Sequence, residues 1–181
     1  VLHFTPDIGV PKVISAKEKI NKLNPDVQVN CYHELFSKYN ALSIISNYDF
    51  VLDCTDNFAA KFLINDSCVY LKKPYSHGAI LGFEGQTFTY IPESSCYRCI
   101  YSEAPPADSA PSCSQAGVLG AIAGMLGTIQ AVETLKFITG SGELLTNKLL
   151  RFNALTMDFK RLNVLKNDEC SVCNDSANAN P

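Results

Sequence analysis

The sequence predicts an α/β fold whose sheet has a parallel core, gains antiparallel strands later in the chain, and is stapled by zinc in its C-terminal part. Two apolar runs, residues 50–52 and 75–80, flank a helical segment, which is the strand–helix–strand pattern of a parallel pair. Two Cys-x-x-Cys pairs, at 96/99 and 170/173, have the spacing of a four-thiolate metal site. Further strand-like segments lie at 86–91, 148–152 and 159–165.

Length and composition indicate a single globular domain. The 181 residues are 46% hydrophobic and 18% charged, which is enough for one full core. A formal net charge of −3 gives no basic footprint, so nucleic-acid binding is not expected. We expect one domain over residues 1–173 and a disordered polar tail over 174–181. The chain begins Val1-Leu2-His3 without a methionine, and we expect it to be a piece of a longer protein.

The first part of the chain predicts a helix, a strand and a short helix. Pro11 suits the first turn of a helix, and apolar residues then recur at helical spacing as far as Leu23. Asn24-Pro25 should end this helix. Residues 27–31 are a candidate strand, and residues 34–46 contain a candidate short helix.

The middle of the chain predicts the parallel pair and its extension. The run at 50–52 is continuously apolar, which is typical of a parallel strand covered on both faces. The helix that follows should end at Lys72-Lys73-Pro74, and residues 75–80 form the next strand. Glu84-Gly85 predicts a turn before the strand at 86–91.

A long helix is expected over residues 118–138, ending at Gly140. Because glycine costs up to about 1 kcal/mol per helical position, the four glycines that open it need a reason, and close packing against a neighbour is the simplest. They are Gly117, Gly120, Gly124 and Gly127. The apolar stretch at 116–132 is shorter than the roughly 20 residues of a membrane span, so we expect a buried helix and no membrane contact.

The two cysteine pairs favour one structural zinc ion. A four-thiolate site has no open coordination position, so it holds structure and does no chemistry. The 70 residues between the pairs mean that such a site would join two distant parts of the domain. Two reducible disulfides are the alternative. The expected ligands are Cys96, Cys99, Cys170 and Cys173.

Three other cysteines, Cys31, Cys54 and Cys68, lie in apolar stretches and are expected to be buried as small hydrophobic residues. Free thiols beside a metal site suit a reducing compartment, so we expect a cytoplasmic protein.

The segment from Asp53 to Asn57 leaves the strand at 50–52 and enters a helix. Ligands of open α/β sheets bind beyond the carboxyl ends of the strands, where this segment should lie. Asp56 offers the hard oxygen ligands that magnesium prefers. Alternatively, Asp56 or Thr55 only caps the helix, and the residues alone do not decide between the two roles.

Lys12 and Cys113 are two further candidates for chemistry. Lys12 falls in the first turn of a helix, where a cation is unfavourable unless an anion binds nearby; a solvated lysine is the alternative, and the one that the residue alone favours. Cys113 precedes the glycine-rich helix, a setting that lowers a thiol pKa and favours a reactive cysteine; a bystander thiol in a loop is the alternative. The three histidines show no spacing of a metal site or a catalytic triad.

Seven motifs occur in order from the first residues to Cys173. They are Asp7-Ile8-Gly9-Val10-Pro11-Lys12, Leu52-Asp53-Cys54-Thr55-Asp56-Asn57-Phe58, Phe83-Glu84-Gly85-Gln86, Cys96-Tyr97-Arg98-Cys99, Cys113 with Ala116-Gly117-Val118-Leu119-Gly120, Gln130-Ala131-Val132-Glu133, and the Cys170/Cys173 pair. Together they resemble the ThiF/MoeB/HesA family, relatives of ubiquitin-activating enzymes. No single motif is decisive, but the ordered set is highly specific.

The resemblance implies a Rossmann-like fold and an adenylyltransferase that uses Mg-ATP. Its substrate would be the C-terminal glycine of a small ubiquitin-like sulfur carrier of the thiamin or molybdopterin type. Asp56 would ligate magnesium, Lys12 would contact the phosphates, and Asn57 would help to bind the nucleotide. Strands around residues 83–86 would lie near the carrier's tail, and Cys113 matches a cysteine that forms a sulfur-linked intermediate in some relatives.

The resemblance also implies a homodimer, for which the glycine-rich helix is a candidate interface; burial inside the monomer explains its glycines equally well. The family's glycine-rich nucleotide loop and catalytic arginine would precede Val1, and Lys61 stands where the family often carries arginine. We therefore expect these 181 residues alone to bind ATP poorly and to adenylate slowly or not at all. A non-catalytic zinc-stapled scaffold for a ubiquitin-like partner and adenylation of a peptide carboxylate stay open as alternatives. The adenylation reading depends on one spatial prediction, that Lys12 and Asp56 reach a shared pocket.

Overall fold

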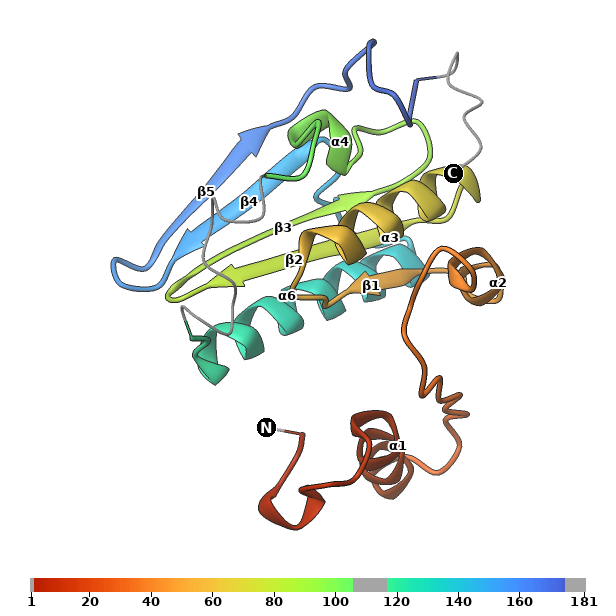
Figure 1. Cartoon of the computed structure of the whole chain (residues 1–181). Helices are drawn as coiled ribbons and strands as arrows, with labels where there is room; N and C mark the ends of the chain where they lie inside the picture. The colour runs from red at the N-terminus through yellow and green to blue at the C-terminus, as the bar shows by residue number, and fades with distance from the viewer. Residues whose placement is uncertain (1, 106–116, 175–181) are drawn as a thin grey trace. The chain divides into compact units, whose positions relative to one another are not determined.

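The computed structural model describes residues 2–105 and 117–174 (Figure 1). The chain forms two compact units, Val1–Phe36 and Ser37–Pro181. The first unit contains the 3-10 helix η1 (Thr5–Asp7) and the helix α1 (Lys12–Leu23).

The helix α1 confirms the helix predicted for the first unit. It begins at Lys12, one residue after the predicted first residue Pro11, and Asn24 is its C-cap. The strand expected at 27–31 is wrong. Each strand of the described sheet pairs with another strand, and residues 27–31 take part in none of these ladders. An extended segment without such a partner has no ladder to satisfy its backbone groups.

The second unit is built on a five-stranded sheet in the order β1-β2-β3-β4-β5. The strand β1 runs parallel to β2, and all later neighbours are antiparallel, which confirms the predicted mixed sheet. The elements are α2 (Ala41–Ile45), β1 (Val51–Asp53), α3 (Phe58–Tyr70), β2 (Tyr75–Leu81), β3 (Glu84–Tyr90), α4 (Tyr97–Ile100), α6 (Gly120–Thr139), β4 (Lys148–Asn153) and β5 (Asp158–Asn163).

Two details of this sheet differ from the sequence predictions. The strand β1 is not covered on both faces, because the Leu52 side chain is 43% exposed. The turn between β2 and β3 lies at Gly82-Phe83 rather than at Glu84-Gly85, since Leu81 pairs with Glu84. Gly82 has a φ of +56°, the left-handed conformation that a two-residue hairpin loop requires.

Successive side chains of a strand point to opposite faces, and the two faces of this sheet differ in chemistry. One face is aromatic: Tyr75 and Phe88 pack edge to face, and Phe88 stacks with Tyr97 of α4. The other face is hydroxyl-rich, and Thr89 Oγ1 donates a 2.6 Å hydrogen bond to the carboxylate of Glu133 on α6. The helices α3 and α4 therefore cover the aromatic face, and α6 covers the polar face (Figure 1).

The helix α6 ends at Gly140 as predicted, with that glycine in the left-handed conformation at a φ of 64°. Only one side of α6 is buried. The expectation of a buried helix is therefore correct for the side that faces the sheet and wrong for the outer side. A Cβ added at Gly120, Gly124 or Gly127 would meet no atom within 4 Å, so close packing inside the described structure does not explain these glycines. Length and composition alone would allow α6 to cross a bilayer, but its buried polar side chains bind the sheet.

Candidate functional site

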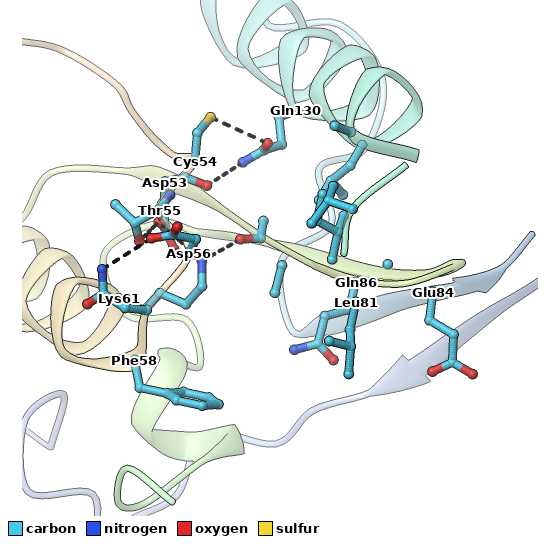
Figure 2. Close-up of a pocket in the computed structure, with 18 of the residues that line it drawn as sticks. Asp53, Cys54, Thr55, Asp56, Phe58, Lys61, Leu81, Glu84, Gln86 and Gln130 are labelled. Carbon is cyan, nitrogen blue, oxygen red and sulfur yellow. Dashed lines mark hydrogen bonds and ion pairs between the residues drawn. The ribbon is translucent and has the colours of Figure 1, made fainter. Parts of the chain in front are cut away.

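A pocket of about 680 Å³ opens where β1 ends and α3 begins (Figure 2). This is the carboxyl end of a parallel strand, the place where ligands of open α/β sheets bind. Its polar lining comes from the loop after β1, the start of α3, the β2–β3 hairpin, α4, α6 and β4. These side chains are Asp53, Thr55, Asp56, Asn57, Lys61, Glu84, Gln86, Tyr97, Tyr101, Gln130 and Arg151.

Asp53, the last residue of β1, is fully buried and joins three neighbours at the base of the pocket. Lys61 Nζ lies 3.2 Å from Asp53 Oδ2 and donates to the carbonyl oxygen of Gly78 at 2.6 Å. His77 Nδ1 lies 2.9 Å from the same carboxylate, and the Thr55 hydroxyl donates to Asp53 Oδ1 at 2.6 Å. These bonds fix the strand end to α3 and β2, and so fix the start of the loop that carries Asp56.

The network sets the charge of its members. Burial alone would raise the pKa of Asp53, but the hydrogen bond with His77 and the positive charge of Lys61 outweigh it, so this pKa lies below its usual range. Burial lowers the pKa of His77 below the ordinary imidazole value, and its bond to Asp53 offsets this only in part. A carboxylate on Asp53 and a neutral imidazole on His77 therefore lie side by side at neutral pH.

Gln130 ties α6 to the base of the pocket. Its Nε2 donates to the carbonyl oxygens of Asp53 and Ser76, both at 3.1 Å. Gly78 is required beneath it, because a Cβ there would lie 2.8 Å from Gln130 Oε1. Cys54 is exposed and lines the pocket, so its predicted burial is wrong; Cys68 is buried as predicted, and Cys31 is partly buried. Partial burial nevertheless raises the pKa of the Cys54 thiol, which makes it a poor nucleophile.

In the loop after β1, one residue caps the next helix and a different residue has its carboxylate exposed at the pocket. Asn57 is the N-cap of α3, and its Oδ1 accepts the Ala60 N–H at 2.9 Å. Thr55 bonds Asp53 through both its N–H and its hydroxyl, so neither Thr55 nor Asp56 caps the helix. Within the described residues, the Asp56 carboxylate has one hydrogen bond, a 3.4 Å contact from Asn57 Nδ2. Its oxygens are exposed at the pocket, which suits a ligand of a hard cation.

A second polar group lies on β3 and β4 at the far end of the pocket. The Tyr101 hydroxyl donates to Gln86 Oε1 at 3.0 Å. Arg151 is the cross-strand neighbour of Gln86 and lies 3.8 Å from Glu84, a long and solvent-exposed ion pair. These polar side chains form one wall of the pocket, and the nearest of them in sequence, Glu84, lies 28 residues after Asp56.

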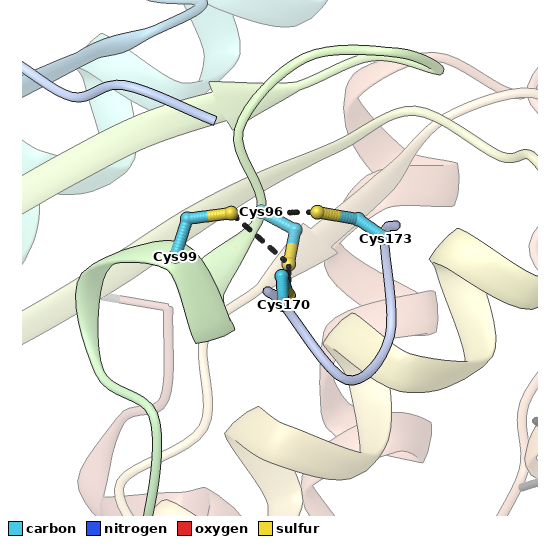
Figure 3. A group of neighbouring side chains, drawn as sticks. All are labelled: Cys96, Cys99, Cys170 and Cys173. Atoms are coloured by element: carbon cyan, nitrogen blue, oxygen red, sulfur yellow. Dashed lines mark hydrogen bonds between the residues drawn. The ribbon is translucent and has the colours of Figure 1, made fainter. Parts of the chain in front are cut away.

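The four cysteines of the two Cys-x-x-Cys pairs come together (Figure 3). All four sulfurs lie within 4.8 Å of one another, and the closest pairs are Cys99–Cys173 at 3.4 Å and Cys96–Cys170 at 3.7 Å. A Zn–S bond of about 2.3 Å in a tetrahedron places sulfurs about 3.8 Å apart, whereas a disulfide needs about 2.05 Å. The donor set and spacing therefore fit zinc, and the disulfide alternative does not describe this arrangement.

Two predicted site residues stay outside this description. Lys12 is exposed at the first turn of α1, as predicted, but it belongs to the first unit and Asp56 to the second, so their shared pocket stays a prediction. Cys113 lies outside the described residues, as does most of the expected tail, 175–181.

Sequence reasoning missed His77 and Tyr101. It placed Asp53 and Gln86 in motifs without giving either side chain a role of its own, and it noted Lys61 only as a departure from the family pattern. One signal was present for Asp53, a carboxylate placed directly after a buried apolar run. No local signal connects Asp53 to His77, or Tyr101 to Gln86, because the partners lie 24 and 15 residues apart.

Comparison with known proteins matches the model of the ThiF family to residues 1–172. The chain is 40% identical over 178 residues to "Adenylyltransferase and sulfurtransferase MOCS3" of Culex quinquefasciatus, covering 97% of this chain and 41% of that protein. It is 39% identical over 181 residues to "Sulfur carrier protein adenylyltransferase" of Thermus thermophilus, covering 97% and 67%. The crystal structure of Escherichia coli MccB with ATP superposes with a TM-score of 0.82 at 20% identity, over 97% of this chain and 54% of MccB, and shows the same fold.

Proposed function

This chain belongs to the ThiF family, and on that premise we propose that the whole protein adenylates the C-terminal glycine of a ubiquitin-like sulfur carrier. The observation that carries the proposal is the exposed Asp56 carboxylate in a pocket at the end of β1, in a chain 39% identical to a sulfur carrier adenylyltransferase. Because the chain spans only 41% of the MOCS3 relative, the activity is proposed for the longer protein. We propose that the 181 residues alone adenylate slowly or not at all.

In the proposed reaction, a carboxylate oxygen of the carrier's glycine attacks the α-phosphorus of ATP. The bond between the α-phosphorus and the bridging oxygen breaks, and pyrophosphate leaves with the electron pair. The nucleophile is already ionised, so the protein needs no general base. Its task is to align the reactants and to neutralise negative charge that develops on the phosphates.

The residues of the loop after β1 fit these tasks. Asp56 has an exposed carboxylate at the pocket that would bind magnesium, and magnesium would neutralise phosphate charge when bound. Asn57 already uses its oxygen as the cap of α3, so its proposed contact with the nucleotide would come from Nδ2. Lys12 would contribute from the uncapped first turn of α1, which has no acidic side chain to neutralise it.

Replacing Asp56 with alanine should lower carrier-dependent ATP–pyrophosphate exchange by about 10²–10³-fold, because the variant loses the proposed magnesium ligand. Stability should change little, since the only hydrogen bond of this carboxylate within the described residues is a long, exposed one from Asn57. The measurement is exchange of labelled pyrophosphate in the full-length protein with a purified ubiquitin-like sulfur carrier. Asp49→Ala, an exposed residue before β1 that does not line the pocket, is the matched control and should exchange at the wild-type rate.

No exchange in the wild-type protein with any carrier would overturn the proposed function. Exchange with a short peptide in place of the carrier would favour adenylation of a peptide carboxylate.

Three further properties belong to the same proposal. None of the seven cysteines in the described residues forms a disulfide, which supports a reducing compartment such as the cytoplasm. Cys113 is the proposed thiol of a sulfur-linked intermediate with the carrier.

The open space beside Gly120, Gly124 and Gly127, together with a 60% exposed Leu135, supports a homodimer through the outer side of α6. Sedimentation of the full-length protein as a dimer tests this, and a monomer at micromolar concentration would contradict it.

A further inference from the structure

The hydrogen bond between Tyr101 and Gln86 fixes the direction of a side-chain amide in the pocket. Gln86 Oε1 accepts from the Tyr101 hydroxyl at 3.0 Å, so the oxygen end of the amide is turned toward the tyrosine. No residue of the described chain accepts a hydrogen bond from Gln86 Nε2. The two N–H donors of that group are therefore free to bind an acceptor in the pocket that Gln86 lines.

Tyr101 is held in turn by the four-cysteine cluster. It directly follows the short helix α4, whose N-cap is the metal ligand Cys96, and the Tyr101 N–H donates to the Tyr97 carbonyl at 2.8 Å. The rings of Tyr97 and Tyr101 lie 5.1 Å apart. A shift of the cysteine loop would therefore move both tyrosines, which line the pocket.

The cysteine loop is also anchored to α3, so it is not an independent appendage. Arg98, between the two ligands of the first pair, makes a bidentate ion pair with Asp66 at 2.7 and 2.8 Å. The Tyr97 N–H donates to Asn65 Oδ1 at 2.8 Å. The metal ligands, α3 and the pocket wall are thus connected by consecutive residues and short hydrogen bonds.

We propose that Tyr101 and Gln86 are positioning residues for the carrier's tail, and that the metal-binding loop keeps them in place. Tyr101 orients the Gln86 amide, and Gln86 Nε2 donates to a backbone carbonyl oxygen of the extended C-terminal segment as it enters the pocket. A peptide segment offers one such acceptor per residue, whereas the nucleotide occupies the Asp56 end. The inference rests on the proposed function, and it gives the cysteine cluster a role in substrate binding as well as in folding.

The test compares Gln86→Leu, Tyr101→Phe and the double variant in the full-length protein, by carrier-dependent pyrophosphate exchange. We expect the KM for the carrier to rise about tenfold in Gln86→Leu and about threefold in Tyr101→Phe, with the KM for ATP unchanged within about twofold. The double variant should be no worse than Gln86→Leu, because Tyr101 acts through Gln86. Tyr70→Phe, an exposed tyrosine on α3, is the matched control and should keep both constants.

A second measurement tests the link to the metal without relying on activity. Hydrogen exchange followed by mass spectrometry should be faster at residues 84–90 and 97–101 in zinc-free Cys170→Ser protein than in the wild type, and unchanged there in Tyr70→Phe. If hydrogen exchange in both segments were as slow in Cys170→Ser as in the wild type, the proposed role of the metal-binding loop would be overturned.

The outcomes separate the inference from the proposed function. Two results would overturn the inference alone, provided that the wild-type protein catalyses pyrophosphate exchange. One is an unchanged KM for the carrier in Gln86→Leu, and the other is additive effects of the two substitutions on that KM. A parallel rise in the KM for ATP would assign both residues a general structural role instead. Absence of exchange in the wild type would overturn the proposed function and this inference with it.

Discussion

Replacing Asp53 with alanine is expected to lower the free energy of unfolding by about 3–5 kcal/mol and to abolish the proposed activity. The substitution leaves the ammonium of Lys61, whose side chain is 6% exposed, without its counter-charge inside the protein. It also removes the acceptor of both Thr55 hydrogen bonds, so the loop that presents Asp56 loses its anchor. Denaturant unfolding followed by circular dichroism measures the loss.

The double variant Asp53→Ala/Lys61→Met distinguishes two contributions of the carboxylate to stability, its ion pair with Lys61 and its other hydrogen bonds. Because it removes the unpaired ammonium as well, it should recover a large part of the lost stability without restoring activity. Asp49→Ala serves again as the control and should unfold like the wild type. A single Asp53→Ala variant within 1 kcal/mol of the wild type would show that water reaches Lys61 and that the network is not a buried ion pair.

Loss of the metal should lower the free energy of unfolding by an amount similar to the loss expected for Asp53→Ala. Cys170→Ser removes one of four ligands, and apparent zinc-binding free energies of four-ligand sites reach about 10–16 kcal/mol in small domains. We therefore expect the variant to purify without its equivalent of zinc, and its free energy of unfolding to fall by several kcal/mol. Metal content by atomic emission and thermal unfolding of the same samples check both statements.

Cys31→Ser is the matched control for this experiment, because Cys31 belongs to the first unit and not to the sulfur cluster. It should keep a full equivalent of zinc. Wild-type protein purified under reducing conditions without any bound metal would contradict the zinc assignment, and so would a Cys170→Ser variant with unchanged metal content.

The sequence predicted best the features that depend on near neighbours in the chain. The strand–helix–strand unit, the end of α6 at Gly140 and the cysteine pairs follow from local periodicity, turn chemistry and ligand spacing, and the structure agrees with each. The prediction for residues 27–31 was wrong because a strand depends on a partner elsewhere, which local composition does not reveal.

The site was predicted only where the motif itself carries the chemistry. Asp56 and Asn57 stand out within one short segment, and the structure divides their roles between pocket and cap. The neighbouring Asp53 has the same side chain and a different environment, because burial beside Lys61 and His77 depends on how α3 and β2 pack. The pairing of Tyr101 with Gln86 likewise requires the fold to bring α4 over β3.

The hydrogen bonds beneath α6 restrict how that helix can move. Gln130 donates to the carbonyl oxygens of Asp53 at the end of β1 and Ser76 on β2. Glu133 accepts hydrogen bonds from the Thr89 hydroxyl and the Leu145 N–H at 2.6 and 2.7 Å. Sliding α6 by one turn, about 5.4 Å, would strand both buried side chains without partners, whereas a purely apolar interface would tolerate such a step far better. A displacement of α6 by a partner on its outer side would therefore move Asp53 with it, because the helix cannot slide along the sheet.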